Sequence, residues 1–150
     1  MADTVHVAIE DAEDAVRLTR ANAARWHIRP NAIGLMGFSA GGHLAAMVGM
    51  LAPADARPDF LMLGYPAVPA ALAVTSSTPP TFLVAADDDM TVNAAENAGR
   101  FYAALRAARV RAELHIYSAG GHGFGILQSG KTSAAWPEAF RAWLTAAQLD

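Results

Sequence analysis

The chain has 150 residues, of which 53% are hydrophobic and 17% are charged, and its formal net charge is −3. This length and composition predict one domain with a well-buried core and argue against a disordered chain. The negative net charge without a Lys/Arg-rich block argues against a nucleic-acid-binding surface, and the lack of a run of 18 apolar residues argues against a membrane span. The sequence contains no cysteine, which excludes disulfides, thiolate catalysis and cysteine-ligated zinc.

The first third of the chain predicts a helix, a strand and a second helix, in that order. Residues 9–26 carry apolar side chains at helical spacing, with acidic residues first and arginines later, an order that suits the helix dipole. Pro30 ends this helix. The apolar run 33–38 predicts a short buried strand, and the run 41–51 predicts an apolar helix that ends before Pro53.

The rest of the chain repeats this alternation of strands and helices. Strands are predicted at residues 60–65, 81–86 and 113–117, and helices at residues 93–109 and 137–147. Asn93 and Glu96 stand three residues apart, as in a capping box. The strands are mostly continuous apolar runs, which is typical of a parallel sheet covered on both faces. We therefore expect an α/β domain over residues 1–150, with a mainly parallel sheet of about four strands and helices on both faces.

A serine lies at the junction of the first strand and its helix, in the pentapeptide GFSAG at residues 37–41. This pattern is typical of a nucleophile elbow, in which a sharp strand-to-helix turn presents the hydroxyl group of Ser39. Gly37 and Gly41 are expected to supply room for the close approach of strand and helix. A phosphate-binding glycine turn in a flavodoxin-like domain is the weaker alternative, because it leaves the later sequence GGHGFG unexplained.

A nucleophilic serine requires a base, and the base requires an acid that orients it. His122 lies in the glycine-rich loop SAGGHGFG after the last strand, and we expect it to reach the elbow. The other four histidines are expected to be solvated or to have structural roles; they are His6, His27, His43 and His115. Among the three aspartates at 87–89, we expect one to be buried against the histidine and the others to be solvated.

Four segments resemble the small bacterial carboxylesterases and acetylxylan esterases of the α/β-hydrolase superfamily. They are GFSAGGHLA at 37–45, PPTFLVAADDD at 79–89, ENAGRFYAALRAARVRAELHIY at 96–117 and GGHGFG at 120–125. The resemblance implies Ser39 as nucleophile and His122 as base. The family pattern D-x-x-V implies Asp89 as the acid, with Asp88 as the alternative, because the match to this pattern is imperfect.

The resemblance also sets expectations for the rest of the site. The N–H of Ala40, the residue after the nucleophile, would bind the oxyanion. Phe38, Met90 and Phe124 flank the three reactive residues in sequence and are expected to wall the acyl pocket. No metal or organic cofactor is expected, and the short loop before the third strand predicts no cap domain.

The resemblance differs from the usual family pattern in one large respect. The family fold has about eight strands, and this chain matches the last four. No HGGG-type motif, which would supply a second oxyanion donor, precedes Ser39. The strand at 33–38 would then have an unpaired edge. We expect either that residues 4–7 cover this edge as a short strand or that two chains pair there, and we predict a homo-oligomer.

These observations predict a serine carboxylesterase that acts on short-chain acyl esters and is located in the cytoplasm. The alternative is an inactive hydrolase-like remnant that binds a small molecule or acts as a subunit.

Overall fold

The structure is a computed structural model that describes residues 2–69, 71, 73–126 and 130–149. Its centre is a four-stranded parallel sheet in the order β1-β2-β3-β4. The strands are β1 (Gly34–Phe38), β2 (Phe60–Gly64), β3 (Thr81–Ala86) and β4 (Ala112–Tyr117). The predicted parallel sheet is thus confirmed, and its strand boundaries lie within one residue of those expected.

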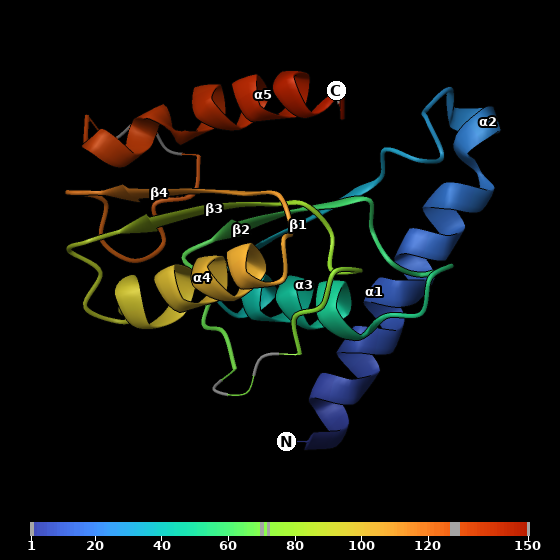
Figure 1. The fold of residues 1–150 in the computed structure, drawn as a ribbon, viewed down its shortest axis with the longest axis horizontal. Coiled ribbons are helices and arrows are strands. Elements are labelled where there is room, and N and C mark those ends of the chain that lie inside the picture. Colours follow the sequence, from blue (N-terminus) through green and yellow to red (C-terminus); the bar gives the residue numbers. More distant parts are fainter. Residues whose placement is uncertain (1, 70, 72, 127–129, 150) are drawn as a thin grey trace.

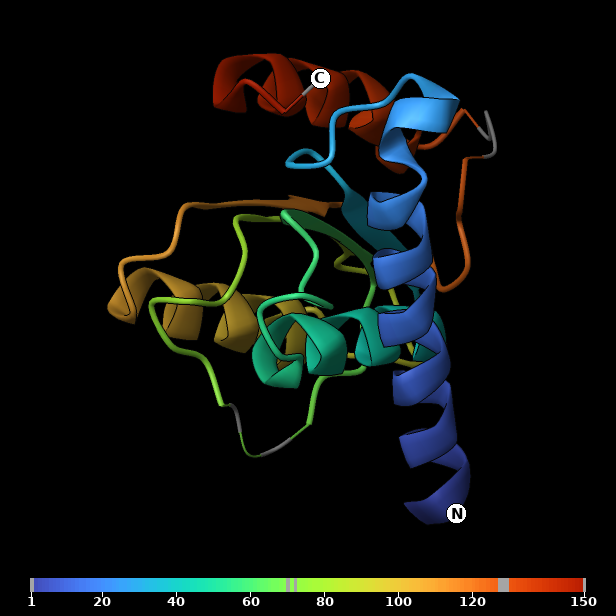
Figure 2. The same ribbon diagram turned by 90° about the vertical axis from the view of Figure 1, so that its right-hand side faces the viewer.

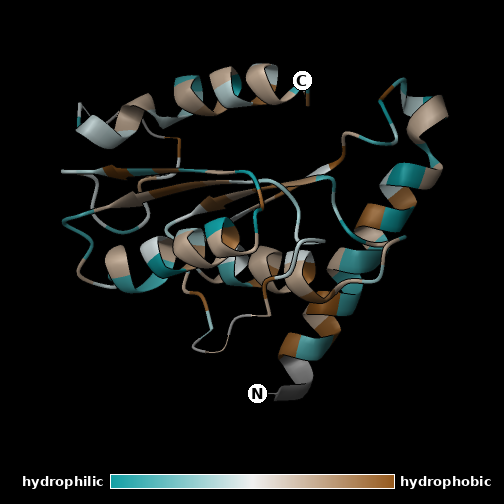
Figure 3. Cartoon of the chain, in the orientation of Figure 1, coloured by the Kyte–Doolittle hydropathy of each residue, from teal (hydrophilic) through white to brown (hydrophobic). Residues whose placement is uncertain are grey.

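Helices cover both faces of the sheet, as the continuous apolar strands predicted (Figure 1). On one face lie α3 (Ala40–Leu51) and α4 (Arg100–Ala107), whose Ala45 and Phe101 pack with Leu63 and Leu83 of the strands. On the other face lies α5 (Trp136–Ala147), whose two tryptophans pack with β2 and β3. Hydrophobic residues are concentrated on the strands, whereas the helices also carry hydrophilic segments (Figure 3).

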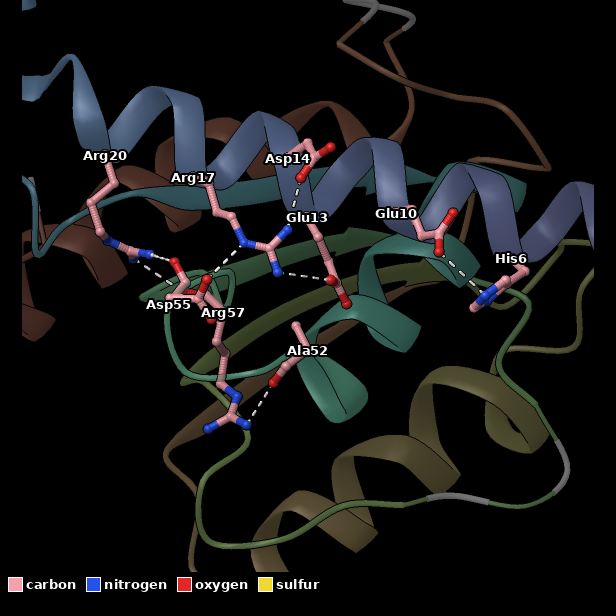
Figure 4. Close-up of polar contacts among 9 residues, drawn as sticks. All are labelled: His6, Glu10, Glu13, Asp14, Arg17, Arg20, Ala52, Asp55 and Arg57. Carbon is pink, nitrogen blue, oxygen red and sulfur yellow. Dashed lines mark hydrogen bonds and ion pairs between the residues drawn. The ribbon is translucent and has the colours of Figure 1, made fainter.

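The N-terminal helix α1 (Ala2–Ala21) packs against α3 beside the β1 side of the sheet (Figures 1 and 2). Its arginines fasten it to the loop that follows α3. Arg17 Nε donates to Asp55 Oδ2 at 2.7 Å, and Arg20 donates to the carbonyl oxygens of Asp55 and Arg57 (Figure 4). Arg20 also donates to the carbonyl oxygen of Pro30, which precedes β1. These bonds hold the C-terminal half of α1 at the end of the sheet where the strands begin.

The expectation that residues 4–7 form an edge strand is wrong. These residues lie within α1, which begins at Ala2. Ile9 and Ala12 lie three residues apart on this helix and pack against Val48 and its neighbours. The helix that these contacts hold continues toward the N-terminus through the segment where a strand was expected. β1 has only β2 as a neighbour among the described residues, which leaves its other edge open. Pairing of two chains at this edge stays a prediction.

Two of the predicted helices differ in detail from their expected form. The helix predicted at 9–26 is interrupted at Asn22, after which α2 (Ala23–Trp26) forms a single turn. The helix predicted at 93–109 opens with a π-helical turn at Ala95–Gly99, ahead of α4. Asn93 caps this turn as expected, since its Oδ1 accepts the Glu96 N–H at 2.9 Å.

None of the helices in the described part of the chain is both long enough and apolar enough to cross a membrane.

Candidate active site

Ser39 stands between β1 and α3 in a backbone conformation that residues with side chains rarely adopt, with φ 52° and ψ −117°. Gly37 makes this turn feasible. A Cβ atom at position 37 would lie 2.1 Å from the carbonyl oxygen of Gly41, so any side chain there would collide with the backbone of the helix. The Ser39 N–H donates to Gly64 O of β2 at 2.9 Å, which ties the elbow to the neighbouring strand.

The second glycine of the motif has a different environment from the one expected. A Cβ atom at Gly41 would meet no described atom within 4 Å. The room for the close approach therefore comes from Gly37 and not from Gly41, which contributes its backbone to the contact.

Ser39 belongs to a continuous chain of hydrogen bonds with His122 and Asp89. Ser39 Oγ lies 2.8 Å from His122 Nε2, and His122 Nδ1 lies 2.7 Å from Asp89 Oδ2. These side chains follow β1, β4 and β3, respectively, so the parallel sheet brings their three loops to the edge where its strands end. An alcohol, an imidazole and a carboxylate in this order can activate the hydroxyl group as a nucleophile.

The carboxylate of Asp89 is buried, with 1% of its side chain exposed, and all its described partners favour the charged form. Burial acts to raise the pKa of this carboxyl group, but its hydrogen bonds outweigh burial and leave the pKa below the ordinary value. Oδ1 accepts the N–H groups of Thr91 and Val92 at 2.8 and 2.9 Å, while Oδ2 faces His122. Asp89 is thus a fixed anion beside the imidazole.

The loop that carries His122 is held by aromatic residues from two other elements. The Tyr65 ring lies 5.0 Å from the His122 ring, measured between centroids, and Tyr65 Oη accepts the Gly125 N–H at 3.2 Å. Trp136 Nε1 donates to the carbonyl oxygen of Gly125 at 2.6 Å. The imidazole therefore packs against an aromatic wall, and the loop behind it is bonded to the ends of β2 and α5.

Asp88 is exposed, as expected for the second aspartate, but it is not simply solvated. Its Oδ1 accepts the N–H groups of Gly120 and Gly121 at 2.8 and 2.6 Å. Because His122 is bonded to Asp89 in the structure, Asp88 does not occupy the position of the orienting acid.

The remaining histidines lie away from this chain of hydrogen bonds. His43 Nδ1 lies 2.6 Å from Ala67 O, and His115 Nε2 lies 2.7 Å from Glu113 Oε1. His6 is exposed on α1, and His27 is exposed at the end of α2. Their positions agree with solvated or structural roles.

The three residues expected to wall an acyl pocket have very different surroundings. Phe38 is partly buried against Tyr65 and Trp136, with ring centroids 5.6 and 5.9 Å away. Phe124 is 6% exposed and belongs to the same core cluster, whereas Met90 is 97% exposed. Their role in binding a substrate stays a prediction.

Two open cavities adjoin the site, one apolar and one polar. The apolar cavity has a volume of about 480 Å³ and lies between α1 and the start of α3, where Ala40 and Gly41 form part of its wall. The polar cavity has a volume of about 570 Å³ and is lined by the loop that contains Asp87, Asp89 and Met90. Both volumes fall in the range of small-molecule sites, which is about 300–1,000 Å³.

No group of three or more metal-ligating side chains suited to a metal ion occurs among the described residues.

Sequence reasoning missed Tyr65 and Trp136 as supports of the site. Tyr65 was visible only as the last residue of a predicted apolar strand, and Trp136 lies directly before the helix predicted at 137–147. Their contacts with the His122 loop depend on how that loop folds back, and no local pattern in the sequence predicts this. The one signal was position, since Tyr65 comes at the end of an apolar strand, where parallel sheets gather functional residues.

Comparisons with known proteins agree with the fold. The family model described as prolyl oligopeptidase family matches residues 58–148, and the model described as BD-FAE matches residues 2–65. An acetylxylan esterase from Xylanibacter ruminicola is 32% identical over 151 aligned positions, which cover 80% of this chain. The alignment covers 32% of that esterase, so this chain spans about a third of its length.

Solved structures are similar over nearly the whole chain. An acetyl ester-xyloside bifunctional hydrolase from Caldicellulosiruptor lactoaceticus matches with a TM-score of 0.83 and 30% identity, covering 94% of this chain and 66% of the other. MGS-M1, an α/β-hydrolase enzyme from a deep-sea metagenome library, matches with a TM-score of 0.81 and 28% identity, covering 91% and 62%.

Proposed function

The chain belongs to the prolyl oligopeptidase family of α/β-hydrolases, and from this premise we propose that it is a serine carboxylesterase acting on short-chain acyl esters. The observation that carries the proposal is the unbroken hydrogen-bond chain from Ser39 Oγ through the His122 ring to Asp89. The relatives of this chain support the reaction class, since they include an acetylxylan esterase and an acetyl ester-xyloside bifunctional hydrolase.

In the proposed reaction, Ser39 Oγ attacks the carbonyl carbon of the ester while His122 Nε2 accepts the hydroxyl proton. Asp89 accepts a hydrogen bond from the Nδ1–H of His122, which leaves Nε2 free to act as the base, and its negative charge stabilises the imidazolium that forms. The imidazolium then donates its proton to the departing alcohol oxygen, and an acyl-enzyme remains. Water attacks the carbonyl carbon of this ester with His122 again as the base. The imidazolium then returns its proton to the departing Ser39 Oγ, and the carboxylic acid is released.

The developing oxyanion lies beside the N-terminus of α3 in this scheme. Ala40 is the first residue of that helix, so its N–H has no partner within the helix and can donate to the oxyanion. The apolar cavity that begins at Ala40 suits a short acyl group. The proposed substrate is thus a small ester whose acyl group lies on the α3 side. The homo-oligomer and the cytoplasmic location stay predictions.

The test is hydrolysis of p-nitrophenyl acetate and butyrate by the wild type, Ser39→Ala and His122→Ala. Each substitution removes a member of a unit that acts together, so each should lower kcat by about a thousandfold or more. His115→Ala is the matched control for slow hydrolysis by surface histidines, because His115 is half-exposed and bonded to Glu113. It should retain wild-type activity.

Labelling with a fluorophosphonate gives a second readout that does not depend on turnover. Ser39 should be labelled in the wild type and unlabelled in His122→Ala, with Ser118→Ala as a control that retains labelling. If Ser39→Ala hydrolysed the esters as fast as the wild type, the hydrolysis would not depend on Ser39. This result would exclude the serine esterase proposal and favour the alternative, a hydrolase-like remnant without a catalytic site.

A further inference from the structure

We propose that Asp88 is a positioning residue for this reaction, because its carboxylate holds the backbone that presents His122; this inference rests on the proposed function. Asp88 Oδ1 accepts two consecutive backbone N–H groups, from Gly120 at 2.8 Å and from Gly121 at 2.6 Å. The next residue is His122. One oxygen atom from the loop after β3 thus fixes the peptide groups directly before the proposed base.

Gly120 is also held from its other side. Lys131 Nζ donates to the carbonyl oxygen of Gly120 at 3.1 Å, so Gly120 is bonded through its N–H to Asp88 and through its C=O to Lys131. A Cβ atom at Gly120 would lie 2.8 Å from Ala86 Cβ, at the end of β3. The start of the histidine loop is therefore pressed against the sheet as well as bonded to it.

Charge strengthens this arrangement. The N–H groups of Gly121 and Gly120 lower the pKa of the Asp88 carboxyl group, and the positive charge of Lys131 lowers this pKa further. Hydrogen bonds to an ionised acceptor are about twice as strong as those between neutral groups. An exposed aspartate in this setting is a strong acceptor for two adjacent amides.

Asp88 and Asp89 would then share the task of placing one imidazole. Asp89 contacts the ring and sets its orientation, whereas Asp88 contacts only the backbone and sets the position of the loop. The distance from His122 Nε2 to Ser39 Oγ is 2.8 Å, so a small displacement of the loop would break this contact. A misplacement of about 1 Å can lower a rate by about a hundredfold.

The experiment compares Asp88→Ala with Asp88→Asn in p-nitrophenyl butyrate hydrolysis. Asp88→Ala should lower kcat by about tenfold to a hundredfold with little change in KM, because the base is displaced while the substrate site is not. Asp88→Asn should recover most of the rate, since its amide oxygen can accept the same two N–H groups. Asp11→Ala is the control, because this aspartate is exposed on α1, away from the site, and its side chain has no hydrogen-bond partner among the described residues. It should retain the wild-type kcat.

Thermal unfolding of each variant separates a misplaced base from a misfolded chain. If Asp88→Ala keeps the wild-type kcat, or if it loses activity only because the fold is lost while Asp88→Asn is equally inactive, the positioning role is wrong. A wild type without Ser39-dependent hydrolysis would instead remove the proposed function itself, and with it this inference.

Discussion

The strand that carries the proposed nucleophile and the strand that carries its acid have opposite surroundings. β3 pairs with strands on both sides, and all six of its residues are buried. β1 pairs on one side only, and Gly37 is the only fully buried residue among its five. The acid therefore follows a fully buried central strand, and the nucleophile follows a partly exposed edge strand. The position of Ser39 depends correspondingly more on its local turn and on its bond to β2.

The largest expected effect tests the acid at the end of β3. Asp89→Asn should lower kcat by about ten-thousandfold, because an amide beside Nδ1 favours the imidazole tautomer that cannot accept the serine proton. Single-turnover acylation by p-nitrophenyl butyrate measures this, with circular dichroism as the control for folding. Retention of wild-type kcat would mean that the buried strand does not supply the orienting acid.

A second prediction compares the two strands directly in stability. Leu83 of β3 is fully buried, so Leu83→Ala should lower the free energy of unfolding by about 2–5 kcal/mol. Met36 of β1 is 48% exposed, so Met36→Ala should change it by less than about 0.5 kcal/mol. Urea unfolding of both variants gives the values. An equal loss of unfolding free energy in the two variants would contradict the difference in burial between β3 and β1. It would indicate that another surface, such as a second copy of the chain, covers β1 in solution.

A third prediction sharpens the account of the turn after β1. Gly37→Ala should lower the free energy of unfolding by about 1–3 kcal/mol, since the new methyl group collides with Gly41 O. Gly41→Ala should instead raise it by up to about 1 kcal/mol, because alanine favours the helix and its Cβ meets open space. Thermal denaturation of the pair measures the difference. A destabilised Gly41→Ala would show that this space is occupied in solution.

The smallest expected effect concerns acid stability at the end of β3. The pKa of Asp89 is lowered in the folded chain, so its ionised form stabilises the fold above the unfolded pKa, about 3.9. This contribution is lost as the pH falls through the lower folded value. The free energy of unfolding of the wild type should therefore approach that of Asp89→Asn as the pH decreases below about 4. A difference that stays constant from pH 6 to pH 3 would contradict this.

The sequence was sufficient to predict the elements whose residues face one uniform environment. The strands at 60–65 and 81–86 were predicted because burial on both faces makes them continuous apolar runs. The start of α1 was missed because Thr4, Val5 and Val7 are β-branched residues, which favour strands, and because the packing partner of this helix, Val48, lies far along the chain.

The site was predictable where a motif carries its own geometry and less so where loops meet. The elbow at Ser39 follows from glycine spacing, and His122 from a glycine-rich loop after the last strand. The contacts of Asp88 with Gly120 and of Trp136 with Gly125 join loops that are distant in sequence. Such contacts depend on the three-dimensional course of each loop, so residue type alone could not distinguish Asp88 from a solvated aspartate.

The backbone angles of Ser39 make the reacting residue a source of instability. Its φ of 52° and ψ of −117° lie in a region that glycine adopts freely and that costs other residues about 1–3 kcal/mol. Ser39→Gly should therefore be inactive yet more resistant to unfolding than Ser39→Ala, which keeps the Cβ atom and its cost. At this one position, selection for robustness and selection for chemistry favour different amino acids.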